Sequence, residues 1–553
     1  MSTAVSYPGI YVQEMPLSTQ TISPAPTSIT AFVGYTHPWK TAAFNTAVQI
    51  FSFSDYEANF GGLYSSNLFD SNVARAVFAF FQNGGTNAYV VGLQPSAHGT
   101  TDTVAFGLDS GDLRAVATIV PDTSAPTVGI QLLALEPADP AERLQMTAKV
   151  TNLRTTATAP TVYTLFDLII TYGTRVEVYR SLDISIAKGQ PKSLDKVING
   201  VSSLVTVQPM AGTTYGTDFP YTSPALPVPP APASFSLTQL GVTPAAGLPA
   251  GFSGCFAIGD FLPVFQQNSS LDNVEIFNLL LVPGVADNTV LSAALAFAER
   301  KRAFSIVDPP AGATAFQIPG SPLPTIDSVM TSGAIPLSQN GALYFPYLNT
   351  TDPVTGSPTT VAPSGYVAGI YSSTDASRGV WKAPAGMATT LLGTTGPVAS
   401  GVMNDMQQGV LNLDSINCLR SFADAGTVVY GARTLVAGDT AFAQSKYVPV
   451  RRMTLFIEQS LIGSLKWVVF EPNDEPLWLA IKSSIEAFLL ALFNQQALQG
   501  SKPSEAFQVK CDSTTTTAAD QQLGIVNIVV GVALLKPAEF VIIKIAQLAG
   551  QTA

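Results

Sequence analysis

The clearest helical pattern lies in the last quarter of the chain. Apolar residues recur every three or four positions from Leu477 to Leu492, after the segment KWVVFEPNDEPLW, and Gly500 and Pro503 supply stop signals. This spacing predicts one long helix that ends near Leu498. Shorter helices with the same spacing are predicted at 70–82, 288–302 and 450–463.

Strand patterns fill the stretches between these helices. VEIFNLLLVPG and AFSIVDPP flank the helix predicted at 288–302, and a strand, helix, strand order with a short helix predicts parallel pairing. INCLRSF and TVVYGARTL are predicted to pair with each other, and FDLIITYGTRVEVYR is a predicted hairpin around Tyr172 and Gly173. The fold class that follows is mixed α/β in a multidomain chain.

Changes in composition divide the chain into seven predicted parts. Prolines interrupt the first 28 residues, residues 101–210 are rich in Thr and Val, and SPALPVPPAPAS is typical of an exposed linker. The parts are an N-terminal extended arm (1–28), a first body segment (29–100), a β-rich insertion (101–210), a Pro/Ala-rich linker (211–250), a second α/β body segment (251–400), a C-terminal domain (401–538) and a C-terminal strand arm (539–553).

The chain contains unusually few charged residues. They make up 12% of its 553 residues, about half the ~25% of ordinary globular proteins. Such a chain either sits in a membrane or buries much of its surface, in an assembly or in a large core. The longest apolar run, from Leu523 to Leu535, is interrupted by Asn527 and Gly531 and is shorter than the ~20 residues of a spanning helix. We therefore expect burial in an assembly rather than membrane insertion, while an ordinary large core stays open.

Net charge and cysteine content exclude further classes. The net charge of −11 argues against a nucleic-acid-binding protein, which needs basic patches to displace counterions. Cys255, Cys418 and Cys511 are far apart and form no CxxC pair, which argues against a disulfide framework or a structural zinc site. The start MSTAVSYPGI lacks the basic and apolar regions of a signal peptide. These features suit a reducing cytoplasm.

Three carboxylates, Glu471, Asp474 and Glu475, lie just before the long helix. They could form a catalytic or metal site, or they could begin the helix. Asn473 or Asp474 can accept hydrogen bonds from the free N–H groups of the first turn, acidic residues there suit the helix dipole, and proline is tolerated. Only Glu471 is left without a local role, and no histidine lies nearby. We therefore predict a helix start.

Other candidate chemistry is sparse. Asp308 follows an apolar strand, but the chain has no Gly-Lys pair for a phosphate loop, so a turn-capping role is favoured over Mg²⁺ binding. His37 and His98 lie far from any candidate nucleophile, which disfavours Ser/His and Cys/His catalysis. The basic pair Arg451 and Arg452 is expected on the solvated or interface side of its helix. We predict no catalytic residue, no cofactor and no metal site.

Strand-like segments stand near both ends of the chain. GIYVQEM lies between prolines near the start, and EFVIIKIAQL lies near the end. Such a strand either joins its own sheet, which is the usual case, or adds to the open edge of a neighbour. The low charge content favours exchange with a neighbour.

Several motifs, in order along the chain, resemble the contractile tail sheath proteins of bacteriophages and related contractile injection systems. The resemblance covers about residues 1–95 and 250–553, with weaker likeness near 163–207. The motifs are SYPGIYVQE, TSITAFVG, LLVPGVADNTV, FSIVDPP, APSGYVAGIYSSTDASRGVWKAPAG, INCLRSF, GARTL, VRRMTLFIEQS, KWVVFEPNDEPLW, FQVKCD and KPAEFVIIKI.

The resemblance implies a non-enzymatic subunit that stacks as rings or a helix around an inner tube. It implies that the arms Tyr7–Met15 and Glu539–Leu548 add strands to neighbouring subunits, so that subunits stay linked during contraction. The C-terminal region is expected innermost, against the tube, and the insertion outermost. The expected linking residues are Ile10, Tyr11, Val12, Phe540, Val541, Ile542, Ile543 and Ile545. Possible tube-facing residues are Lys466, Lys482, Lys502 and Lys510.

The resemblance also implies partners and a location. The expected partners are copies of the same chain, an inner tube protein, and baseplate and tail terminator proteins. Assembly is expected in the bacterial cytoplasm, followed by a place in a phage tail or a contractile injection particle. Type VI secretion sheaths divide this body between two chains. Because a single chain carries both ends here, the phage or phage-like case is favoured. Two alternatives remain: a static shell or surface-layer protein, and a carboxylate-dependent hydrolase.

Overall fold

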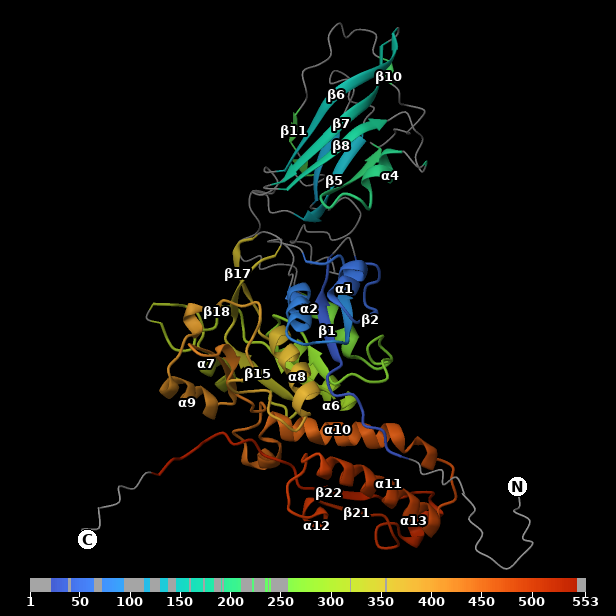
Figure 1. Ribbon diagram of the computed structural model, residues 1–553, viewed down its shortest axis with the longest axis vertical. Helices are drawn as coiled ribbons and strands as arrows, with labels where there is room; N and C mark the ends of the chain where they lie inside the picture. Colours follow the sequence, from blue (N-terminus) through green and yellow to red (C-terminus); the bar gives the residue numbers. More distant parts are fainter. Residues whose placement is uncertain are drawn as a thin grey trace, which may run out of the picture.

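The computed structural model arranges the chain in three layers (Figure 1). Antiparallel sheets stand at one end, a central α/β body lies in the middle, and a layer of long helices closes the other end. The structure describes residues 21–37, 41–63, 72–93, 257–318, 320–353 and 356–544, together with the strands, one short helix and a few adjoining residues between 114 and 239.

An eight-stranded sheet forms the centre of the body, in the order β2-β3-β1-β13-β14-β15-β19-β20. The six inner strands are parallel, and the edge strands β2 and β20 are antiparallel to their neighbours. β1 pairs with both β3 and β13, so segments on the two sides of the insertion build one sheet. The strands are β1 (Thr30–Tyr35), β2 (Ala47–Ile50), β3 (Ala88–Leu93), β13 (Leu279–Leu281), β14 (Phe304–Val307), β15 (Gly341–Phe345), β19 (Ile416–Phe422) and β20 (Gly426–Val429).

Several predicted elements are confirmed within this sheet. The helix α6 (Asn288–Lys301) links the parallel strands β13 and β14, and Asp287 caps it by accepting bonds from Thr289 N and Val290 N. INCLRSF and TVVYGARTL contribute the antiparallel pair β19 and β20. The inner strands are buried on both faces, which explains their nearly continuous apolar sequences.

Two helices pack unusually closely on one face of the sheet. α2 (Asn72–Gln82), predicted from its spacing, crosses α8 (Ser364–Arg378) at two glycines. A Cβ on Gly365 would lie 2.4 Å from the Ala76 carbonyl oxygen, and one on Gly369 would lie 2.8 Å from the Phe80 carbonyl oxygen. Glycine at both positions is therefore what lets the two backbones approach.

Smaller elements complete the body. They are α1 (Phe53–Phe60), α5 (Ile258–Phe261), η1 (Leu262–Phe265), α7 (Ile326–Thr331), β16 (Leu348–Thr351), β17 (Pro358–Val361), β18 (Gly396–Pro397), η2 (Ala399–Gly401), α9 (Asp405–Leu413) and η3 (Thr440–Ser445). The insertion leaves and re-enters beside β1: Leu93, at the end of β3, is the register partner of Tyr35, and the Tyr35 hydroxyl accepts a hydrogen bond from Ala257 N at 2.9 Å.

The insertion contains two antiparallel sheets and the short helix α4 (Leu194–Ile198). The predicted hairpin is confirmed, because β7 and β8 pair with Tyr172 opposite Arg175. Three short strands from 221–239 join these sheets, whereas the sequence suggested only a linker there. The strands are β4 (Arg114–Ile119), β5 (Ile130–Pro137), β6 (Met146–Thr158), β7 (Thr161–Tyr172), β8 (Arg175–Asp183), β9 (Val205–Pro209), β10 (Tyr221–Thr222), β11 (Ser234–Ser236) and β12 (Thr238–Gln239).

The third layer is built on two helices, α10 (Val448–Ser464) and α11 (Glu475–Asn494). By length and composition alone, α11 could cross a membrane. Its inward side chains instead share a buried cluster with α10 and β21. The remaining elements are η4 (Lys466–Val468), α12 (Pro503–Ala506), β21 (Phe507–Lys510), α13 (Ala518–Gln522) and β22 (Val529–Val532).

Arg452 joins this layer to the body, and its expected place on the solvated or interface side of the helix is wrong. Its side chain is only 3% exposed and forms a bidentate ion pair with Asp375 at the end of α8. It also donates to the Thr27 carbonyl oxygen at 2.9 Å and lies 4.6 Å above the Tyr371 ring. Burial alone would lower the pKa of Arg452, but the Asp375 carboxylate reverses the shift and raises it. The charge is therefore retained and fully compensated.

We predict that Arg452→Met destabilises the protein by about 3–5 kcal/mol, because it leaves the Asp375 carboxylate buried without its partner. Chemical unfolding followed by tryptophan fluorescence measures this, since Trp467 and Trp478 lie in the α10 and α11 cluster. Arg302→Met is the matched control. Arg302 follows α6 and pairs with Glu458 on α10, the helix that carries Arg452. Both side chains of this control pair are about two-fifths exposed. Its loss should stay within about 1 kcal/mol, and equal losses would contradict the prediction.

Candidate functional site

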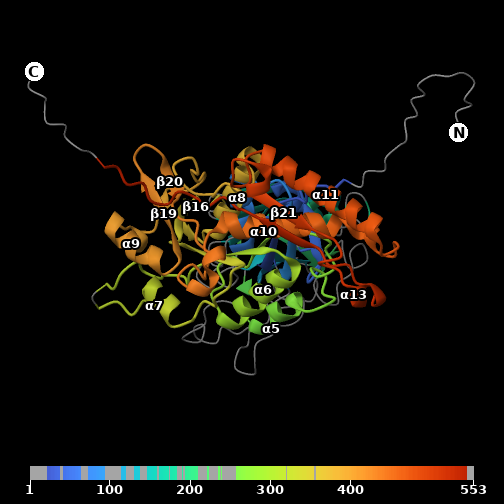
Figure 2. The ribbon, with the colours of Figure 1, turned by 90° about the horizontal axis from the view of Figure 1, so that it is seen from below.

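The two ends of the described chain meet α10 at its opposite ends. On one side, residues 21–28 run along α10, where Ser23 N donates to Ser464 Oγ at 3.0 Å and Ala25 N donates to Ser460 Oγ at 2.9 Å. Ile22 is buried in the α10 and α11 cluster. On the other side, Glu539 contacts Tyr447, the residue that precedes α10. The described N-terminal and C-terminal segments therefore contact opposite ends of one helix (Figures 1 and 2).

Glu539 forms a clamp that fixes the base of the C-terminal segment. Its carboxylate accepts two hydrogen bonds from Arg433 at 2.8 Å, one from Asn412 Nδ2 at 2.8 Å and one from the Tyr447 hydroxyl at 3.0 Å. Burial opposes the charged carboxylate, but these donors outweigh it and lower the pKa of Glu539. Sequence reasoning had placed Glu539 in the arm but had not identified its three partners.

Beyond the clamp, the chain presents consecutive apolar side chains to solvent. Phe540, Val541, Ile542 and Ile543 are 73–82% exposed and belong to no strand of the single chain. Four exposed large apolar residues in a row are uncommon on a protein that works alone. Of the other residues expected to link subunits, Ile10, Tyr11, Val12 and Ile545 lie outside the described residues.

The helix layer also contains a sheet that is open at its sides. Among the described strands, β21 and β22 pair only with each other, antiparallel, from Phe507 opposite Val532 to Lys510 opposite Val529. The segments FQVKCD and GIVNIVVG supply these strands, and β22 is only four residues long. A two-stranded sheet is marginal by itself and has edges able to accept further strands.

The four lysines predicted to face a tube all lie in this layer. Lys466 is mostly exposed and 3.1 Å from Glu275, while Lys482 forms a long 3.9 Å pair with Glu486 on α11. Lys502 and Lys510 are exposed beside α12 and at the end of β21. Between them, α11 turns outward a face without charge, made of Leu479, Ser483, Ala487 and Leu490. This face is a feature that the lysine pattern alone did not reveal.

Asp474 and Glu475 begin α11, as predicted. Asp474 is its N-cap and accepts from Leu477 N at 3.0 Å, and Asn473 accepts from Trp478 Nε1 at 2.8 Å. Asp308 is a buried turn cap that accepts bonds from Gly284 N and Ser364 N. No group of three His, Cys, Asp or Glu side chains suited to a metal occurs among the described residues.

Asp327 and Asp414 are neighbouring carboxylates, and burial and Asp327 raise the pKa of Asp414. Neither residue lines the groove of about 1480 Å³ that lies between the end of α8, β20 and residues 535–541. His37 is buried directly after β1, and His98 lies outside the described residues. Among the described residues, the exposed row 540–543 and the two-stranded sheet β21–β22 are the surfaces suited to association.

Part of the chain matches a known protein family. Residues 268–435, which include most of the central sheet, match the family model described as the phage tail sheath protein central domain. The chain thus carries that domain, and the resemblance predicted from its motifs is confirmed.

The chain is similar to one set of proteins in sequence and to another in fold. The tail sheath protein of Vibrio phage KVP40 is 29% identical over 151 residues, which are 27% of this chain and 21% of that protein; the match therefore spans about a fifth of the relative. The contracted sheath complex of the extracellular contractile injection system PVC has the same fold, with 20% identity, a TM-score of 0.55 and 99% of each chain covered. A chain from the baseplate of the anti-feeding prophage matches with 22% identity, a TM-score of 0.54 and 98% of this chain and 99% of that chain covered.

We predict that acid releases the C-terminal segment from the Glu539 clamp. Because the folded pKa lies below the usual 4.5, the clamp contributes its full stability above pH 4.5 and loses it as the pH falls through the lowered value. The free energy of unfolding, measured as a function of pH, should fall in this window. Glu539→Gln should remove most of this pH dependence. Equal acid sensitivity in both proteins would contradict the assignment.

Proposed function

We propose that this chain is the structural subunit of a contractile tail sheath, which polymerises around an inner tube and contracts to drive the tube through a target envelope. The observation that carries the proposal is the row Phe540–Ile543, exposed in the single chain but anchored at its base by Glu539. An anchored, β-branched, apolar segment suits a strand that is completed by another subunit.

The open sheet β21–β22 is the acceptor that this proposal requires. A strand from a neighbour can pair with either edge through backbone hydrogen bonds, and its apolar side chains can cover the partly buried Val530 and Val532. Residues Tyr7–Met15 and Phe540–Leu548 supply the donors in this proposal. Each subunit then gives strands to its neighbours and receives strands in its own sheet.

Contraction needs rigid bodies joined by links that do not break. The eight-stranded sheet and the buried Arg452 pair suit a rigid body, and the arms diverge from opposite ends of α10. Subunits can then rotate and slide while their strands stay paired. The energy comes from a metastable extended lattice, which is consistent with the lack of a Gly-Lys phosphate loop in the sequence. The role we propose is structural rather than catalytic.

We infer that the α10 and α11 layer lies against the tube and that the insertion lies outside. The layer and the insertion stand at opposite ends of the molecule (Figure 1). The uncharged outward face of α11, with Leu479 and Leu490 exposed, is best covered by a partner, and Lys482 at its margin can meet an acidic tube. Baseplate and terminator proteins would close the ends of the sheath, which would assemble in the bacterial cytoplasm.

The test is electron microscopy of negatively stained recombinant protein. We expect the full chain to form hollow, striated cylinders and a variant that ends at Glu539 to remain monomeric and folded, because it keeps the clamp but lacks the strand. The control is a variant with Phe540, Val541, Ile542 and Ile543 present but residues 549–553 removed, which should still assemble. Cylinders from the variant that ends at Glu539 would contradict strand exchange through this arm. Flat sheets in a single state would favour a static shell.

A further inference from the structure

One loop in the helix layer exposes side chains for which the structure shows no side-chain hydrogen bond or ion pair within the described chain. Val469, Phe470 and Glu471 lie between η4 and the cap of α11, and Phe470 is fully exposed. Phe470 also has a φ of 72°, a left-handed conformation that costs about 1 kcal/mol or more for a bulky residue. The caps Asn473 and Asp474 explain the residues that follow, but they leave Phe470 and Glu471 unexplained.

A large groove lies at the other end of the same helix pair. It has a volume of about 1480 Å³ and runs between the end of α8, the strand β20 and the segment 535–541. Aromatic and apolar side chains line it, among them Trp381, Met387 and Tyr430. Ligand pockets usually measure about 300–1,000 Å³, so this groove can hold several residues of a polypeptide.

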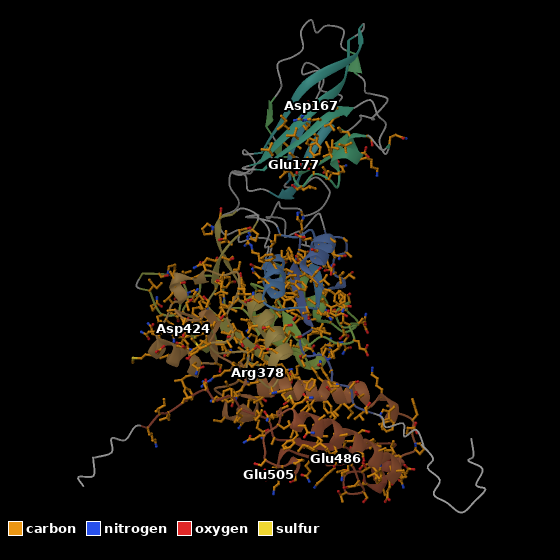
Figure 3. The ribbon with its side chains drawn as sticks, in the orientation of Figure 1. Asp167, Glu177, Arg378, Asp424, Glu486 and Glu505 are labelled. Carbon is orange, nitrogen blue, oxygen red and sulfur yellow. The ribbon has the colours of Figure 1, made fainter. Side chains whose placement is uncertain are left out.

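The groove carries positive charge, in contrast to the acidic chain as a whole. Within it, Asp375, Asp405 and Glu539 are each paired with an arginine. The remaining cations are Arg378, Lys382 and Lys536. Burial and the neighbouring Arg378 lower the pKa of Lys382, as expected where like charges gather. Figure 3 shows Arg378 where the body meets the helix layer.

The loop and the groove are complementary and lie too far apart to meet within one subunit. The loop follows the C-terminal end of α10, whereas the groove includes Tyr447 at its start and Gln495 at the end of α11. α10 has 17 residues, so roughly 25 Å separates them. A contact between unlike surfaces at opposite ends of a molecule is head-to-tail, and such contacts generate rings or open helices.

We propose that the loop Val469–Glu471 of one copy docks in the groove of the next, with Phe470 against the aromatic lining and the Glu471 carboxylate against Arg378. This inference rests on the proposed sheath function and adds a side-chain contact to strand exchange. Charge pairing sets the orientation, and burial of Phe470 compensates for its unfavourable backbone conformation. The contact gives Glu471 the role that helix capping does not provide.

Cysteine cross-linking tests the contact directly. In a chain that carries Val469→Cys, Ser377→Cys and Cys255→Ser, which keeps Phe470, Glu471 and Arg378, oxidation should produce a ladder of trimers and larger species on a non-reducing gel. A bond within one copy is excluded, because a disulfide needs Cα atoms within about 7 Å. Cys418 and Cys511 are buried and stay in place. Each single cysteine variant is the control and should give dimers at most.

Charge reversal supplies a second test. Glu471→Lys or Arg378→Glu should each raise the protein concentration needed for assembly by about tenfold or more, and the double variant should restore assembly toward the original concentration. If the unmodified chain forms cylinders but there is no ladder and no rescue, this contact is wrong and the sheath proposal stands. A ladder without cylinders would support the contact and count against the sheath.

Discussion

The buried ion pair of Arg452 with Asp375 is the interaction on which the architecture depends. One guanidinium holds together α10, the end of α8 and the backbone of the N-terminal segment at Thr27. Its charge could not be buried without the carboxylate, and the carboxylate could not be buried without it. The position of the helix layer on the body, and the path by which the N-terminal segment reaches β1, are therefore set by the same contact.

A second arginine, Arg433, marks the boundary between the fixed C-terminal residues and the exposed apolar segment. Arg433 lies in the body and holds Glu539, and the apolar side chains begin at the next residue. In the proposed strand exchange, this arrangement would hold the donor strand at a fixed point, so less conformational entropy would be lost when a neighbour accepts it.

Sequence patterns predicted the local elements well, and their limits have physical causes. α2, α6, α10 and α11 were all expected from apolar spacing, and the caps Asp287 and Asp474 from residue type. The burial of Arg452 was missed, because its partner lies 77 residues earlier and spacing along one helix does not reveal it. The helix α11 also ends at Asn494 rather than near Leu498, since Gln496 adopts a φ of 60° where no glycine signals a stop. Within the candidate site, the apolar C-terminal segment was predictable from its strand-like sequence. The two-stranded sheet, the Glu539 clamp and the groove were not, because they depend on contacts between distant segments.

The way the insertion joins the body has one more consequence. Its two junctions converge on Tyr35, which neighbours Leu93 in the sheet and accepts a bond from Ala257 N. For the sheet, the insertion is a loop of more than 150 residues whose two ends lie close together beside Tyr35. The entropic cost of closing such a loop grows only slowly with its length. The insertion can be lengthened, shortened or exchanged at little cost to the body. The sheets of the insertion can therefore vary while the eight-stranded sheet and the helix layer stay the same.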